Sequence, residues 1–355
     1  MENKIKKTKN NKILWSILFL IIAVMSVWAV IQQNENFSVA TLIASFKSDR
    51  IIWLIVAVVG IGVYVWLEGR ALLTLNKSLG YPGKFTDGLL YSASDIYCSA
   101  ITPSATGGQP ASAYFMVKRG VPGTVATVSL LVNLIMYTLS IVVIGILCLI
   151  FRPDILISLP WHTQSLIYIG IAVQIGLVLI FLLLLWKSNI LWAIGDGGIK
   201  ILGKLHLLRK PGHKRVKLRH AIDSYRDRVH QVSGQRKTLI KSFIYNLLQR
   251  AVLTSISGFV CLAMGGSFSD FISVSVLQAF VILGASWIPI PGAMGVTDLM
   301  LIEGFESCWP KGSLVHSSAL NLELCSRGVS FYACVLLCGG FVLFMMLKDK
   351  MRRVQ

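Results

Sequence analysis

The sequence predicts an all-α integral membrane protein with about six full transmembrane helices and two opposed re-entrant hairpins of broken helices. Three observations carry this prediction. Hydrophobic residues make up 55% of the 355 residues and charged residues only 14%, whereas soluble domains carry about 25% charged residues. Several apolar runs reach the roughly 20 residues that a helix needs to cross a bilayer. Two further apolar stretches are interrupted by Pro and Gly. This composition excludes a water-soluble globule, a disordered chain and a fibrous repeat.

Six apolar runs are long enough to span a bilayer. They are Ile13–Ile31, Ile51–Leu73, Val125–Phe151, Ser165–Trp186, Leu239–Met264 and Ser318–Leu347. The first run follows five lysines, a pattern that a secretory signal peptide also has. We favour a retained span, because the run is longer than the apolar part of a signal peptide and no small-residue cleavage site precedes Gln32.

Positive charge sets the orientation of these spans. The net charge is +18, and Lys and Arg concentrate in cytoplasmic loops of membrane proteins. This rule places both termini and residues 187–237 in the cytoplasm. The assignment is consistent only if residues 86–119 and residues 271–305 each enter and leave the membrane on a single side. The first stretch would then start from the cytoplasm and the second from outside.

One polytopic membrane domain over residues 1–355 follows from this orientation. Its first half, residues 1–187, and its second half, residues 238–347, would have inverted topology. Between them, residues 188–237 form a basic cytoplasmic segment, in which residues 189–208 have the pattern of an amphipathic interfacial helix. Its charge either follows the ordinary positive-inside rule or recruits anionic lipid.

Both interrupted stretches contain residues that break helices. The first has Pro103 and Gly107 near its centre, and the second has a cluster at Pro289, Pro291, Gly292 and Gly295. Broken helices persist in a bilayer only where protein or a wet cavity satisfies their backbone groups, and transporters place substrate sites at such breaks. The alternative is a kink that only lets helices pack closely.

The first break offers a candidate anion site, because free amides at a helix N-terminus bind phosphate. The groups that would bind it are the backbone and side chains of Thr102, Ser104, Thr106, Gly107, Gly108 and Gln109.

Ionisable side chains at membrane depth are expensive and usually face an interior or a cavity. The candidates are Asp95, Arg250, Asp298, Glu323 and Arg327. For the two arginines, one interpretation is a cationic station for a lipid phosphate, since the guanidinium fork suits phosphate. The other is structural pairing with Glu323 or Asp298. The acids could instead meet a cationic headgroup.

Other residues have plainer interpretations. Glu68 and Arg70 lie near the end of the second span, so we expect them to reach the cytoplasmic interface. The seven cysteines are scattered and are expected to be small packing residues. No catalytic residue, metal site or cofactor is expected.

Two segments resemble the signatures of a known family. Thr102–Ala111 reads TPSATGGQPA and is followed by the basic Lys118–Gly120, while Pro289–Asp298 reads PIPGAMGVTD. They resemble the lysylphosphatidylglycerol synthase transmembrane-region family, the flippase-like domain of bacterial multiple peptide resistance factor and of YbhN-like proteins. The chain departs from the family pattern at Ala293, where the family has Gly, and at Asp298, where it has Glu.

The resemblance implies translocation of lysylphosphatidylglycerol, phosphatidylglycerol or a related lipid to the outer leaflet of the bacterial cell membrane, and thereby resistance to cationic antimicrobial peptides. An alternative is a phosphatidylglycerol lysyltransferase, or part of such a system. A third is a non-transporting partner that stabilises another membrane protein. Full-length members add a soluble aminoacyltransferase domain. The sequence ends at Gln355 directly after the last span, so we expect no such domain and no enzyme activity of this chain alone.

The expected partners are the membrane and an anionic or aminoacylated phospholipid. Nucleic acid is expected only as lysyl-tRNA, if the chain is the lysyltransferase. The sequence has no Walker motif, so the driving force would be the lipid gradient, a coupled ion or the membrane potential.

Overall fold

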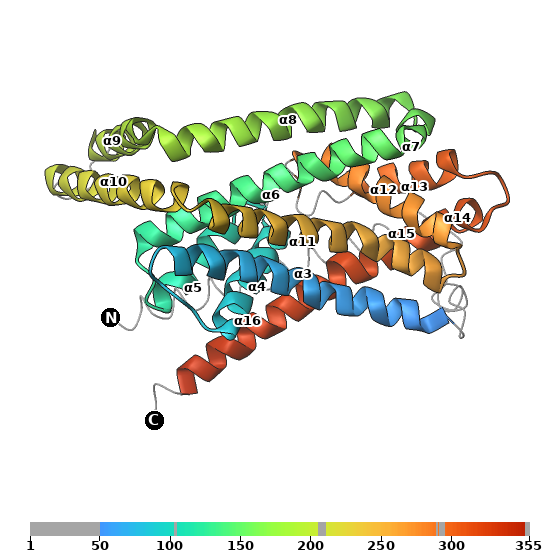
Figure 1. Ribbon diagram of the computed structural model, residues 1–355, viewed down its shortest axis with the longest axis horizontal. Helices are drawn as coiled ribbons and strands as arrows, with labels where there is room; N and C mark the ends of the chain where they lie inside the picture. Colours follow the sequence, from blue (N-terminus) through green and yellow to red (C-terminus); the bar gives the residue numbers. More distant parts are fainter. Residues whose placement is uncertain (1–49, 103–104, 205–210, 289, 291–294, 352–355) are drawn as a thin grey trace.

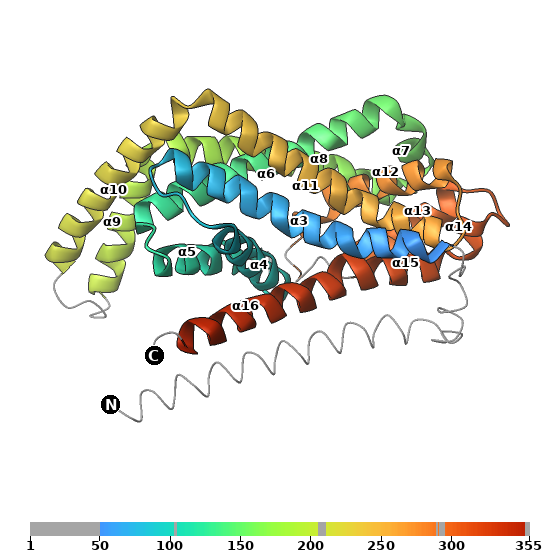
Figure 2. The same ribbon diagram turned by 60° about the horizontal axis from the view of Figure 1, so that its bottom comes forward.

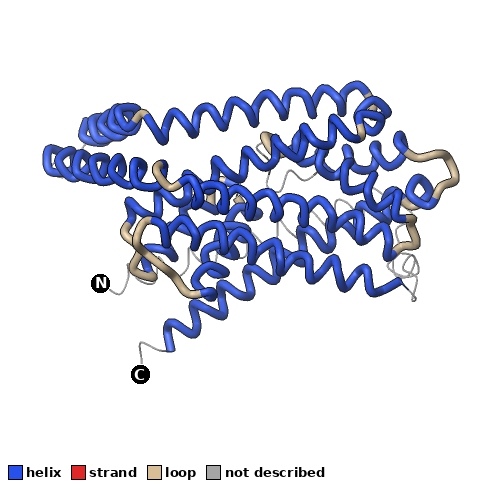
Figure 3. The backbone as a smooth tube through the Cα atoms, in the orientation of Figure 1, coloured by secondary structure: helices blue, strands red, loops and turns tan. Residues whose placement is uncertain are grey.

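The computed structural model describes residues 50–102, 105–204, 211–288, 290 and 295–351. Helices follow one another through these ranges, and no strand appears within them (Figure 3). Six helices are long and apolar enough to cross a membrane. They are α3 (Ile51–Ser78), α6 (Gly123–Phe151), α8 (Trp161–Trp186), α11 (Arg236–Ala263), α12 (Phe268–Ala285) and the continuous helix Ala319–Asp349. The predicted all-α, multi-pass membrane fold is confirmed.

Five of the predicted spans lie on these helices within a few residues at their ends. The predicted span Ile13–Ile31 lies outside the described residues. The sixth observed helix, α12, was expected to be a half-helix of the second interrupted stretch. It has 18 residues, and at about 1.5 Å per residue it is nearly as long as the hydrocarbon core is thick.

The outer surface of the bundle is apolar and much of its interior is polar. Large exposed apolar side chains cover α3, α6, α8 and the last helix, for example Ile150 on α6, Leu179 on α8 and Leu336 on the last helix. Such broad apolar surfaces are rare on soluble monomers. Ser, Thr, Asn, Gln and charged side chains are buried between the helices instead, as a protein dissolved in lipid requires.

An antiparallel pair, α3 and α11, forms the centre of the molecule (Figure 1). At one end, Arg50 Nη1 donates to the carbonyl of Gly266 at 2.9 Å. At the other end, Gln235 Nε2 donates to the carbonyl of Ser78 at 2.9 Å. Contacts at both ends keep the two helices in register over their whole length.

The first interrupted stretch folds into a hairpin of α4 (Phe85–Ile101) and α5 (Gly108–Lys118). Asp87, in the first turn of α4, accepts the backbone N–H of Lys84 at 3.0 Å. The same carboxylate lies 3.2 Å from Nε of Arg119, the residue that ends α5. The entry and the exit of this hairpin are therefore joined by an ion pair.

The second interrupted stretch has the same plan, with α12 followed by α13 (Val296–Cys308). Asp270, in the first turn of α12, accepts the backbone N–H of Ser267 at 2.8 Å. It also accepts Nε1 of Trp309, the residue that ends α13, at 2.8 Å. In both hairpins the first arm is the longer one.

The open ends of the two hairpins lie at opposite ends of the α3–α11 pair (Figures 1 and 2). α4 packs on the C-terminal half of α3, where Gly69 approaches the backbone of Gly88. α12 packs on the C-terminal half of α11, where Gly258 approaches Phe271. Because α3 and α11 are antiparallel, the hairpins point in opposite directions. The predicted inverted topology of the two halves requires hairpins that point in opposite directions. That each hairpin enters and leaves the bilayer on one side stays a prediction.

Short elements complete the bundle. α7 (Pro153–Ser158) follows α6, and α14 (Leu314–Ser317) precedes the last helix, which comprises α15 (Ala319–Arg327), a π-helical turn η4 (Gly328–Ala333) and α16 (Cys334–Met351). At one end of the molecule, α9 (Ser188–Lys204) and α10 (Pro211–Ser233) pack on each other and project from the bundle (Figure 2).

Candidate functional site

A first polar cluster lies between α3, α4, α6 and α11. Its ionisable members are Glu68, Asp95 and Arg250, which are 7%, 6% and 4% exposed. They come from three different helices, so only the packed bundle brings them together.

Arg250 lies between two tyrosine rings rather than beside an acid. Its guanidinium donates to the hydroxyls of Tyr64 at 3.0 Å and Tyr137 at 3.3 Å. Its central carbon lies 5.2 Å and 4.3 Å from the centres of the two rings, which is the geometry of cation–π contacts. Among the described residues, no carboxylate forms an ion pair with Arg250, so the predicted pairing with Glu323 or Asp298 is wrong for this arginine.

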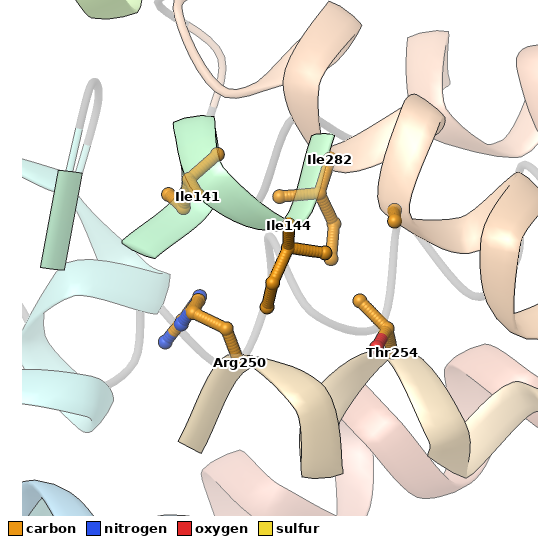
Figure 4. Close-up of a pocket in the computed structure, with 6 residues that line it drawn as sticks. Ile141, Ile144, Arg250, Thr254 and Ile282 are labelled. Atoms are coloured by element: carbon orange, nitrogen blue, oxygen red, sulfur yellow. The ribbon is translucent and has the colours of Figure 1, made fainter. Parts of the chain in front are cut away.

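A small pocket opens beside Arg250 (Figure 4). It is lined by Ile141 and Ile144 of α6, by Thr254 of α11 and by Ile282 of α12. The figure shows the arginine and Thr254 on one side and the isoleucines on the other. The space holds about one water molecule, so a lipid headgroup would enter only after helices move apart.

Glu68 is the main correction to the sequence analysis. It was expected at the cytoplasmic interface, but it is buried in the cluster. Gln249 Nε2 donates to Glu68 Oε2 at 2.9 Å, and the hydroxyl of Ser92 donates to the same oxygen at 3.3 Å. Both donors are neutral, so no described cation is hydrogen-bonded to this carboxylate. Arg70, in contrast, is exposed as expected.

Asp95 is likewise held by neutral groups. Gln109 Nε2 donates to Asp95 Oδ2 at 2.7 Å and the hydroxyl of Ser99 donates to Oδ1 at 3.1 Å. Gln109 lies in the first turn of α5, so this contact joins the second arm of the hairpin to the first. A side chain on Gly108 would collide with Asp95 and Ser99, which explains the glycine at this position.

These contacts change the predicted anion site at the first break. The backbone N–H of Gly107 donates to the hydroxyl of Thr102 at 2.8 Å, and that hydroxyl donates to the carbonyl of Cys98 at 2.7 Å. The Gly107 amide and the Thr102 hydroxyl are therefore already bonded. Thr106 is exposed, and Ser104 lies outside the described residues. The carboxylate of Asp95, rather than a ligand, lies at the N-terminus of α5, where negative charge is favourable.

A second polar cluster joins the second hairpin to α15. Arg327 Nε donates to Asp298 Oδ1 at 2.6 Å and lies 3.9 Å from Glu323 Oε1, while Nη2 donates to the hydroxyl of Thr297 at 2.9 Å. Asp298 Oδ2 also accepts the backbone N–H of Gly295 at 2.9 Å. For Arg327, the structural pairing with Glu323 and Asp298 is confirmed.

Sequence reasoning missed the two tyrosines that contact Arg250 and the place of Glu68 in the first cluster. Tyr64 and Glu68 are four residues apart on α3 and so share a helix face. Asn246, which donates to Asn133 at 3.0 Å, lies on the same face of α11 as Arg250 by the same spacing. Polar residues repeated at helical spacing within an apolar span were the signal that could have identified this cluster.

The other candidate groups are possible metal ligands, the cysteines and the basic segment. Within the described ranges, no group of three or more His, Cys, Asp or Glu side chains is arranged to hold a metal ion. The seven cysteines are free, and four of them are buried. In the basic segment, hydrogen bonds from Lys200 and Arg215 hold the pKa of Asp196 below its usual range, and these contacts tie α9 to α10.

Comparison with known proteins supports the resemblance seen in the sequence. A family model described as the lysylphosphatidylglycerol synthase TM region matches residues 13–338, which include both clusters and both hairpins. Comparisons with curated proteins and with solved structures find no match.

Proposed function

Because the chain belongs to the lysylphosphatidylglycerol synthase transmembrane-region family, we propose that it moves an aminoacylated phospholipid between the two leaflets of the bacterial cell membrane. The family links this multi-pass membrane protein to the handling of lysylphosphatidylglycerol. Translocation of the lipid, the direction toward the outer leaflet and the cytoplasmic placement of both termini are parts of the proposal.

One observation carries this proposal: the charges of the first cluster are not paired with each other. Arg250 contacts tyrosines, while Glu68 and Asp95 accept hydrogen bonds from neutral groups. Buried charges without charged partners are costly. A ligand that brings both charge signs into the cluster would remove this cost.

The balance of charge selects the headgroup. Two carboxylates and one guanidinium leave one excess negative charge when all three are ionised. The headgroup of lysylphosphatidylglycerol has one phosphate and two ammonium groups, so it brings one excess positive charge. Its phosphate would bind Arg250 and its ammonium groups would bind Glu68 and Asp95. Unmodified phosphatidylglycerol has only the phosphate and would leave both acids unpaired.

Movement of the hairpins would admit this headgroup. The pocket beside Arg250 is far smaller than a headgroup. α12, in the second hairpin, contributes Ile282 to the wall of this pocket, while α4, in the first hairpin, carries the buried Asp95. Because the hairpins point in opposite directions, separation of one and then of the other would expose Arg250 to each leaflet in turn. A cationic lipid moved outward would also lower the negative surface charge that attracts cationic peptides.

Purified protein in liposomes tests the proposal. We expect fluorescent lysylphosphatidylglycerol to change leaflet faster than fluorescent phosphatidylglycerol, as measured by chemical quenching of the outer leaflet. Glu68→Gln should lower the rate at which lysylphosphatidylglycerol changes leaflet, because it removes one site for an ammonium group. The exchange rates of the two lipids should therefore differ less than in the wild type. Ser255→Ala is the control and should match the wild type, because this half-buried hydroxyl donates to the Ala251 carbonyl of its own helix.

Two results would contradict the proposal. One is leaflet exchange no faster than in protein-free liposomes, which would favour a non-transporting partner. The other is synthesis of lysylphosphatidylglycerol from phosphatidylglycerol and lysyl-tRNA by the purified chain without any leaflet exchange, which would favour the lysyltransferase.

A further inference from the structure

The second polar cluster contains more acid than base in a closed environment. Glu323 and Asp298 are 1% and 8% exposed, and Arg327 is the cation hydrogen-bonded to Asp298. Nε of Arg327 lies 2.6 Å from Asp298 Oδ1 and 3.9 Å from Glu323 Oε1, so the two carboxyl groups flank one guanidinium nitrogen. Two carboxylates this close together repel each other unless one of them carries a proton. Among the described residues, no group donates a hydrogen bond to the buried Glu323 Oε2, which favours the protonated form of this carboxyl group.

We propose that Asp298 and Glu323 form a proton-binding site that holds one proton between them, and that release of this proton is coupled to movement of the second hairpin. Arg327 is the fixed countercharge of the site. The coupling rests on the proposed lipid translocation, whereas the proton site itself stands on the geometry of the cluster.

A proton fits this site better than a metal ion or a lipid ammonium group. The guanidinium of Arg327 lies 2.6 Å from Asp298 and 3.9 Å from Glu323, so it already occupies the position that another cation would need. A hard metal ion needs six or more oxygen ligands or several bound waters, and this enclosed cluster offers few. A proton needs neither the space nor the ligands.

Among the described residues, Arg327 is the cation that forms ion pairs with Asp298 and Glu323. Other titratable groups on the elements packed around the acid pair include Cys325 on α15, Tyr332 on η4, His316 on α14 and Arg250 on α11. His316 contacts the backbone carbonyl of Glu306 through Nδ1 at 3.1 Å, and Arg250 lies between its two tyrosines. Arg327 is therefore the neutralising charge, and it balances only one carboxylate.

The position of Asp298 connects the proton to the hairpin. Asp298 accepts the N–H of Gly295, a glycine with φ of 78° at the turn into α13, so this carboxylate fixes the start of the second arm. With the proton bound, the acid pair joins α13 to α15. When the O–H bond breaks and the proton leaves to water on one side of the membrane, the two carboxylates repel and α13 separates from α15. Uptake of a proton from the other side restores the contact.

Infrared spectroscopy of the full chain in lipid tests the proton site without any lipid transport. At neutral pH we expect the carbonyl band of a protonated carboxylic acid, and Glu323→Gln should remove part of it. Glu306→Gln, the same change at an exposed position on α13, should leave the band unchanged. An identical band in wild type and Glu323→Gln would overturn the proton site.

Leaflet exchange in liposomes tests the coupling. With one proton exchanged per lipid, each unit of pH difference across the membrane should shift the steady-state leaflet ratio about tenfold, and Glu323→Gln should abolish the shift. If the wild type exchanges lipid but ignores the pH gradient, the coupling is overturned. If the infrared difference is present but the wild type exchanges no lipid, the proton site stands and the proposed function fails.

Discussion

Arg250 shows how one residue can keep a charge available inside a membrane protein. The two tyrosines stabilise the guanidinium through ring faces and hydroxyls, and neither neutralises it. A carboxylate in their place would give a stronger pair but would compete with the phosphate of a ligand. The arrangement therefore keeps a buried cation that has no carboxylate partner among the described residues.

We expect Arg250→Lys to slow lipid exchange about tenfold while the protein stays folded. Lysine keeps the charge but loses the planar fork that binds phosphate and the stacking on two rings, which is worth about 1–2 kcal/mol. The measurement is the exchange rate in liposomes, together with thermal unfolding in detergent. Tyr137→Phe is the matched control, since it keeps the ring and loses one hydrogen bond worth about 1 kcal/mol. An unchanged rate in Arg250→Lys would contradict the phosphate role.

The burial of single charges could be predicted from the sequence, but their pairing could not. Asp95, Arg250, Asp298 and Glu323 are buried, as their positions in apolar stretches indicate. Which arginine meets which acid depends on the rotation and depth of helices far apart in the chain. Glu68 was misplaced because the span was expected to end at Leu73. The helix continues to Ser78, so Glu68 lies deeper than its distance from the predicted end suggests.

At the scale of elements, close backbone contacts fix each hairpin on its long helix. A Cβ on Gly69 of α3 would lie 2.7 Å from the carbonyl carbon and oxygen of Gly88 on α4. Backbone atoms cannot rotate away as side chains do, so the two helices would have to separate. A side chain at Gly69 would thus move the hairpin that carries Asp95.

We expect Gly69→Ala to destabilise the protein by about 1–3 kcal/mol, the usual cost of overpacking, and to slow lipid exchange. Gly62→Ala is the control, because it is the same change on the same helix and a Cβ there meets nothing within 4 Å. The control should be neutral or about 0.5–1 kcal/mol more stable. Thermal unfolding in detergent compares the two variants, and equal stability would show that α3 and α4 can separate freely.

The hairpins themselves were partly predictable. Pro and Gly at the breaks indicated where each helix ends, and charge counting indicated that both ends of each stretch lie together. The unequal lengths of the two arms were not part of the prediction. The closing contacts, Asp87 with Arg119 and Asp270 with Trp309, could not be predicted, because each joins residues about 30 to 40 positions apart.

At the scale of the whole molecule, the two hairpins share one plan and point in opposite directions. Each consists of a long arm and a short arm, and in each an Asp in the first turn holds the residue that ends the second arm. The open ends of the two hairpins lie at opposite ends of the antiparallel α3–α11 pair (Figure 1). The inverted topology of the two halves stays a prediction that rests on charge counting.

Labelling of single cysteines from each side of the membrane tests the topology that follows. In a variant without the seven native cysteines, Lys84→Cys and Lys118→Cys should react with an impermeant reagent only from the cytoplasmic side. Ser269→Cys and Lys311→Cys, near the ends of the second hairpin, should react only from outside. Each pair serves as the control for the other, because all four residues lie at the ends of hairpins that differ only in direction. Reaction of Lys84→Cys and Lys118→Cys from opposite sides would make the first stretch a true crossing. The two halves would then no longer be inverted, and the alternating exposure of Arg250 would lose its structural basis.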